Sequence, residues 1–86
     1  MIRPPPADVE IDALGLICPL PVLKARKRLA GLPEGAVLAI LADDPVAVID
    51  LPHFCAEAGH ALLSAEISPL GGRRFVIRKG GPAHAD

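Results

Sequence analysis

The hydrophobic residues of this chain recur with two different periods, and the order of those periods restricts the possible folds severely. Apolar and polar residues alternate over residues 7–13, and similar alternation returns over residues 61–67 and 74–78. A period of two is typical of a strand with one buried face. Residues 36–42 are apolar throughout, and this run is too short for a buried helix. The pattern therefore predicts four strands, the second of them central in its sheet.

The segment between the first two strands carries helix signals. It opens at Cys18-Pro19-Leu20-Pro21, and proline is favoured at the first positions of a helix. Gly31 is placed to end this helix after about Ala30. The sequence thus predicts a first helix with Cys18 at its beginning.

A second helix is expected after Asp43-Asp44-Pro45, where an acidic cap precedes a proline. Because proline is poorly tolerated inside a helix, Pro52 predicts one turn, a break near Asp50 and a helix over residues 51–58. The residues expected to face the sheet share helical spacing: Val48, Leu51, Phe54, Cys55 and Ala58.

The expected order is strand, helix, strand, helix, strand, strand. Since most strands have one apolar face, the two helices should cover one side of a four-stranded mixed sheet. The predicted fold class is α/β (α+β), a two-layer βαβαββ sandwich. A chain of 86 residues has room for one domain, expected over residues 7–80, with flexible tails at 1–6 and 81–86.

Composition excludes several classes of function. The net charge of −1 argues against steering of the whole molecule toward nucleic acid or an acidic membrane. No apolar run approaches the ~18 residues of a membrane span, and the first residues lack the apolar stretch of a secretion signal. We therefore expect a cytoplasmic protein without membrane or direct nucleic-acid contact.

Cys18 is the candidate reactive residue. A thiol at the positive end of a helix is expected to have a lowered pKa, and the thiolate is its reactive form. Pro19 and Pro21 restrict the backbone around it. Position 21 holds proline where a dithiol exchange site would need a second cysteine, so chemistry by a lone thiol is expected. By itself, however, this tetrapeptide is equally consistent with a plain helix start.

Other candidate sites carry weaker signals. Cys55 lies in the apolar stripe and is expected to be buried and inert. His53, His60 and the cysteines match no zinc-binding pattern, so no metal and no cofactor are expected. A terminal thiocarboxylate on Gly80-Gly81 is improbable, because five residues follow; this pair predicts a flexible exit from the last strand.

The first helix carries several cations. Lys24, Lys27 and Arg28 share one face and predict a solvated surface. Arg26 instead projects toward the apolar side of this helix. A guanidinium there must either extend to the solvent at the border of the apolar surface or pair with a carboxylate. Asp43 and Asp44 are the nearest carboxylates by topology, so we expect Arg26 to pair with one of them near Cys18.

The run from Asp12 to Pro21, Asp-Ala-Leu-Gly-Leu-Ile-Cys-Pro-Leu-Pro, strongly resembles the opening of the TusA/SirA family of sulfur-carrier proteins. Similar residues recur in that family at four later places: Arg26-Lys27, residues 42–45, Phe54-Cys55 and residues 77–80. The resemblance covers about residues 12–80. It implies the two-layer sandwich described above.

For the site, the resemblance implies a persulfide on Cys18, with Pro19, Leu20 and Pro21 supporting it. The donor would be a cysteine desulfurase or a rhodanese, and the acceptor a DsrE-like protein. In relatives the sulfur reaches tRNA thiolation, molybdenum-cofactor assembly or sulfur oxidation. The residues expected to contact partners are Ile17, Leu20, Arg26, Lys27, Asp43 and Asp44.

One departure from the family bears on the partner. The form that serves tRNA thiolation has Arg and Glu where this chain has Ile17 and Leu20. Apolar side chains beside the thiol should change which partner docks. Two alternatives stay open: an RNA-contacting or regulatory module using the basic helix face, and a redox switch that forms sulfenic acid or a mixed disulfide.

Overall fold

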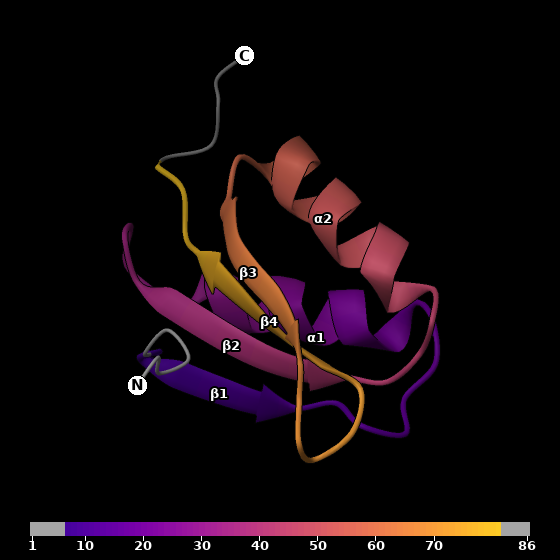
Figure 1. Cartoon of the computed structure of the whole chain (residues 1–86). Helices are drawn as coiled ribbons and strands as arrows, with labels where there is room; N and C mark the ends of the chain where they lie inside the picture. Colours follow the sequence, from indigo (N-terminus) through magenta and orange to yellow (C-terminus); the bar gives the residue numbers. More distant parts are fainter. Residues whose placement is uncertain (1–6, 82–86) are drawn as a thin grey trace.

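The computed structural model describes residues 7–81, which form four strands and two helices (Figure 1). Their order along the chain is β1 (Val9–Asp12), α1 (Leu20–Ala30), β2 (Val37–Ala42), α2 (Ala47–Ala58), β3 (Ala61–Ile67) and β4 (Arg73–Arg78). The predicted tails, apart from Gly81, lie outside the described residues. No helix within residues 7–81 has the length and apolar character needed to cross a membrane.

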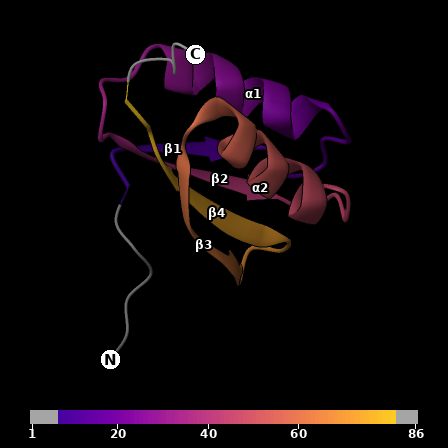
Figure 2. The same ribbon diagram turned by 90° about the horizontal axis from the view of Figure 1, so that it is seen from above.

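The four strands form one mixed sheet in the order β1-β2-β4-β3. β1 runs parallel to β2, with Ile11 opposite Ile40, because α1 carries the chain back between them. β4 is antiparallel to both β2 and β3. Both helices pack on the same face of the sheet, as Figures 1 and 2 show. The predicted two-layer βαβαββ sandwich is confirmed.

The hydrophobic core lies between that face of the sheet and the helices. Leu38 and Ile40 from β2 and Phe75 and Ile77 from β4 are fully buried there, as alternate residues of a strand should be. The helices contribute six residues to this core, namely Ala25, Leu29, Ala47, Leu51, Phe54 and Cys55. A core of mostly aliphatic side chains thus fixes how α1 and α2 sit on the sheet.

The second helix differs from the expectation in two ways. α2 is continuous from Ala47 to Ala58, and Pro52 lies inside it without the predicted break. Because Pro52 has no N–H, the carbonyl of Val48 receives no helical hydrogen bond from it. Val48 is exposed at the start of α2, where the loss of this bond costs least. Val48 and Ala58 were also wrongly assigned to the buried stripe, since both are exposed and Ala47 is buried instead.

The end of β4 is packed rather than loose. The main-chain N–H of Gly80 donates to Nδ1 of His60 over 2.9 Å. A Cβ at Gly80 would collide with the carbonyl of Gly59, so only glycine allows this close approach. The prediction of a flexible exit was therefore wrong at Gly80, because the chain is held against the start of β3.

Candidate functional site

Cys18 lies in the connection between β1 and α1, and two aspartates from the β2–α2 connection hold that loop. The main-chain N–H of Cys18 donates to Oδ2 of Asp44. The N–H of Gly15 donates to Oδ1 of Asp43 over 3.0 Å, and Gly15 itself has φ of 83°, which favours glycine. The backbone around the thiol is thus anchored to a segment more than twenty residues away in sequence.

The beginning of α1 differs from the prediction by two residues. The helix starts at Leu20 with Pro19 as its cap, so Cys18 precedes the cap position. The N–H of Leu20 donates to the carbonyl of Ile17 over 2.9 Å and is therefore not directed at the sulfur. Since the prolines supply no N–H, the helix start offers little positive potential to Cys18.

The Cys18 side chain is exposed, and its thiol donates to Oδ2 of Asp50 over 3.0 Å. This hydrogen bond to Asp50 is the main reason that the pKa of Cys18 is raised; desolvation and the negative charges of Asp50 and Asp44 raise it further. The expectation of a lowered pKa was wrong, because carboxylates rather than backbone N–H groups surround the sulfur. The raised pKa favours the protonated thiol over the thiolate in the free protein.

Large apolar side chains are exposed on both sides of the thiol. Ile17 and Leu20 flank it in sequence, with exposed fractions of 69% and 44%. Ile49, on the first turn of α2 beside Asp50, is 70% exposed. Exposed side chains of this size next to an exposed thiol are typical of a contact surface for another molecule.

Arg26 does not form the predicted pair with Asp43 or Asp44. Its guanidinium carbon lies 5.7 Å from the centre of the Phe54 ring, and the side chain is exposed. Asp43 and Asp44 are instead occupied by the loop around Cys18. Arg26 avoids burial by packing on an aromatic ring, which satisfies a guanidinium without a carboxylate.

Lys27 lies on a different surface from Arg26. It lines a hollow of about 450 Å³, together with Ile11, Lys24, Arg28 and Gly31. Adjacent residues of a helix point in directions about 100° apart, which explains the separation. The structure therefore brings Asp43 and Asp44 to the loop of Cys18, and it places Lys27 on another face.

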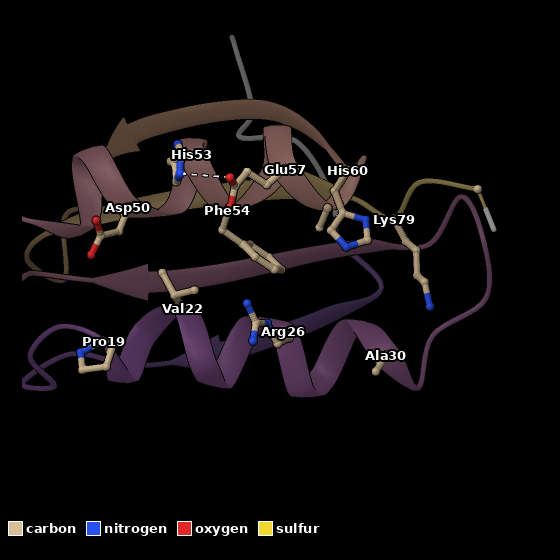
Figure 3. Close-up of a pocket in the computed structure, with 12 residues that line it drawn as sticks. Pro19, Val22, Arg26, Ala30, Asp50, His53, Phe54, Glu57, His60 and Lys79 are labelled. Atoms are coloured by element: carbon tan, nitrogen blue, oxygen red, sulfur yellow. Dashed lines mark ion pairs between the residues drawn. The ribbon is translucent and has the colours of Figure 1, made fainter. Parts of the chain in front are cut away.

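A groove of about 740 Å³ runs between α1 and α2 (Figure 3). Phe54 projects into it from α2 and Arg26 from α1, while Lys79 lies near its far end. The remaining lining residues are Pro19, Val22, Ala30, Asp50, His53, Glu57, Ala58, His60 and Gly81. Pro19, Val22 and Asp50 also line the small hollow that contains Cys18, so the groove adjoins the thiol.

Sequence reasoning missed Asp50 as a site residue. It was considered only as the place where a helix would break. The signal that could have found it is an acidic side chain in the first turn of the helix that follows Asp43-Asp44-Pro45. Its contact with Cys18 joins residues 32 positions apart, which no local pattern reveals.

Cys55 is 2% exposed, as predicted, and burial raises the pKa of its thiol to about 11. Both cysteines are free. Burial and the charge of Lys79 lower the pKa of His60, whose Nδ1 accepts the bond from Gly80. Within residues 7–81, no group of three metal-ligating side chains is assembled.

The fold and the site together define a class of protein: a small two-layer domain that presents one thiol at its surface, between an anchored loop and the start of a helix. The family model described as sulfurtransferase TusA matches residues 9–79. The chain belongs to this family of sulfurtransferase-type sulfur carriers.

A solved structure supports the same assignment. The SirA-like protein of Desulfitobacterium hafniense is similar to this chain with 32% sequence identity and a TM-score of 0.75. The match covers 85% of this chain and 99% of that protein. The resemblance to the TusA/SirA family is therefore confirmed over nearly the whole fold.

Proposed function

We propose that this protein accepts sulfane sulfur as a persulfide on Cys18 and transfers it to a partner protein. The exposure of the Cys18 thiol is the observation that supports the proposal best, because a carrier must reach the active sites of two other proteins. The anchored backbone lowers the entropic cost of presenting that thiol. Cys55 is buried and so cannot readily resolve a persulfide on Cys18.

The transfer consists of two displacements at sulfur. The Cys18 thiolate attacks the terminal sulfur of a donor persulfide, R–S–SH; a new S–S bond forms, and the donor's S–S bond breaks. The donor leaves as a thiolate with the electron pair, and Cys18 carries the S–SH group. An acceptor thiolate then attacks that terminal sulfur, and Cys18 is released as a thiolate. Cys18 must first lose its thiol proton, which is directed at Oδ2 of Asp50 in the hydrogen bond between them.

The donor we propose is a cysteine desulfurase or a rhodanese, and the acceptor a DsrE-like protein. Ile17 and Leu20 are the contact residues best supported by their exposure. Asp43 and Asp44 would act mainly through the Cys18 loop that they hold. Arg26, in the wall of the groove beside the thiol, is better placed for the same partner than Lys27.

The proposed setting is a sulfur relay in the cytoplasm. Its end product would be a thiolated tRNA, an assembled cofactor or an oxidised sulfur compound. Two free cysteines are in keeping with a reducing compartment. The apolar pair Ile17 and Leu20 argues for a partner other than that of the tRNA-thiolation carrier.

Mass spectrometry tests the proposal directly. The protein is incubated with a cysteine desulfurase and cysteine, and Cys18 is expected to gain the mass of single sulfur atoms. Cys18→Ser should abolish the gain, whereas Cys55→Ala should retain it, because Cys55 is buried. Sulfur on Cys55, or only sulfenic acid and mixed disulfides on Cys18, would contradict the proposal.

A further inference from the structure

Asp50 is the carboxylate in direct contact with the reactive sulfur. Its Oδ2 accepts the thiol hydrogen bond of Cys18 at 3.0 Å, and it comes from α2 while Cys18 precedes α1. Asp50 is half-buried, and its position follows from the docking of the first turn of α2 on the Cys18 loop. Any reaction partner of Cys18 must therefore approach this carboxylate.

The charged groups around the sulfur are acidic. Asp44 holds the main chain of Cys18, and Asp50 holds its thiol. The nearby cation Arg26 packs against Phe54, and Lys79 donates to the carbonyl of Leu32 over 2.8 Å. Within residues 7–81, neither Asp44 nor Asp50 forms an ion pair. The reactive centre thus has negative charge that no cation of the described chain balances.

We propose that Asp50 selects the reaction partners of Cys18 by charge, favouring those that carry a cation beside their reactive sulfur. The inference rests on the proposed function and names the chemistry of the partner: a protein whose active cysteine is flanked by lysine or arginine. In the complex, this cation replaces the thiol as the hydrogen-bond partner of Asp50. Asp50 is then a positioning residue, because it acts through Cys18 and the partner's cation.

The groove between the helices gives the partner's cation a route to Asp50. Asp50 lines both the small hollow of Cys18 and the end of the groove nearest Pro19 (Figure 3). A lysine or arginine side chain can therefore reach the carboxylate from the groove while the sulfur atoms meet at Cys18. Exposed Ile17 and Ile49 offer apolar contact to the rest of that partner.

The same geometry couples docking to reactivity. A negative charge beside a thiol disfavours the thiolate, and a cation paired with that charge removes the effect. The pKa of Cys18 is raised, mainly by the hydrogen bond to Asp50, in agreement with this effect. Free protein would keep its thiol protonated, and a partner with a suitable cation would release the thiolate where it is needed.

Two small disulfides of opposite charge test the selection without any protein partner. Cystamine carries two ammonium groups, and 3,3′-dithiodipropionate carries two carboxylates. In either exchange the Cys18 thiolate attacks one sulfur and forms a mixed disulfide with it, while the probe's own S–S bond breaks and the small thiolate leaves and takes up a proton. Each rate is expressed relative to that of the same probe with 2-mercaptoethanol, because the two leaving thiols differ in pKa. On this scale we expect cystamine to react with Cys18 about tenfold faster than the dianion at low salt, and the ratio to fall as salt is added.

Asp50→Asn should bring the two rates within about threefold of each other, because it removes the charge with little change of shape. Glu66→Gln is the matched control, since Glu66 is an exposed carboxylate on β3 that lines neither the groove nor the hollow of Cys18. It should keep the wild-type ratio. Asp50→Glu should restore part of the selectivity. The salt dependence of the wild-type ratio provides a measurement that needs no variant to fold.

Equal rates for both probes in the wild type, or an unchanged ratio in a folded Asp50→Asn protein, would overturn the inference. These results are separable from a failure of the proposed function. A protein that gains sulfur on Cys18 but shows no charge preference retains the carrier function and refutes the selection by Asp50. A protein with the charge preference that never gains sulfur refutes the carrier function.

Discussion

The carboxylate of Asp44 joins the main chain of Cys18 to the beginning of α2. One of its oxygens accepts the N–H of Cys18, and the other accepts the N–H of Val46 over 3.0 Å. The loop that carries the thiol and the helix that carries Asp50 are therefore held by one side chain. The distance from Cys18 to Asp50 depends on this connection.

Replacing Asp44 with alanine should loosen the loop and destabilise the fold. Two main-chain N–H groups lose a charged acceptor, so we expect the free energy of unfolding to fall by about 1–2 kcal/mol, measured by urea denaturation. The amide hydrogen of Cys18 should also exchange faster with solvent. Asp12→Ala is the control, because Asp12 accepts only a local bond from Leu14. Equal effects of both substitutions would argue against a special role of Asp44.

The buried thiol of Cys55 predicts a loss of stability at alkaline pH. Its pKa is about 11 in the folded protein against an ordinary value of 9.0, so the folded state retains a proton that the unfolded state releases. The resulting stability is fully present below pH 9.0 and is lost as pH rises toward about 11. Other groups titrate in this range, so the measurement is the difference from Cys55→Ala. A difference that is constant from pH 8 to about 11 would contradict the burial of this thiol.

Gly80→Ala should lower the melting temperature. The added Cβ would collide with the backbone of Gly59, which cannot move as a side chain can, and overpacking of this kind costs about 1–3 kcal/mol. Gly81→Ala is the matched control, because its Cβ would approach only the side-chain carboxylate of Glu34, at 3.2 Å. Calorimetry should show a clear decrease in the melting temperature for Gly80→Ala and little change for Gly81→Ala. Similar shifts would mean that the contact of Gly80 with Gly59 is not tight.

Arg26→Ala should have a small effect on stability. The guanidinium packs on the exposed edge of the groove and loses only its contact with Phe54, which is worth about 0.5–1 kcal/mol. The pH profile of Cys18 alkylation should not change, since Arg26 is not paired with Asp43 or Asp44. Lys24→Ala serves as the control for removal of a charge from α1. A decrease of more than about 2 kcal/mol in the free energy of unfolding, or a shifted alkylation profile, would support the ion pair that the sequence predicts.

The order of the six elements, and the place of Cys18 between the first strand and the first helix, follow from the sequence by itself. Periods of two and of 3.6 residues depend only on which side chains must leave water, so they show strands, helices and the burial of Cys55 without any knowledge of their neighbours. The run from Asp12 to Pro21 was equally visible, because its residues are consecutive.

The surroundings of the thiol depend on contacts between segments that are distant in the sequence. Asp50 meets Cys18 across 32 positions, and it reverses the direction of the pKa that a helix start had suggested. Arg26 packs on Phe54 instead of pairing with an aspartate, and Pro52 stays within an unbroken helix. Each outcome depends on how α2 docks beside α1, and that docking is set by packing between distant segments, which no local pattern of residues contains.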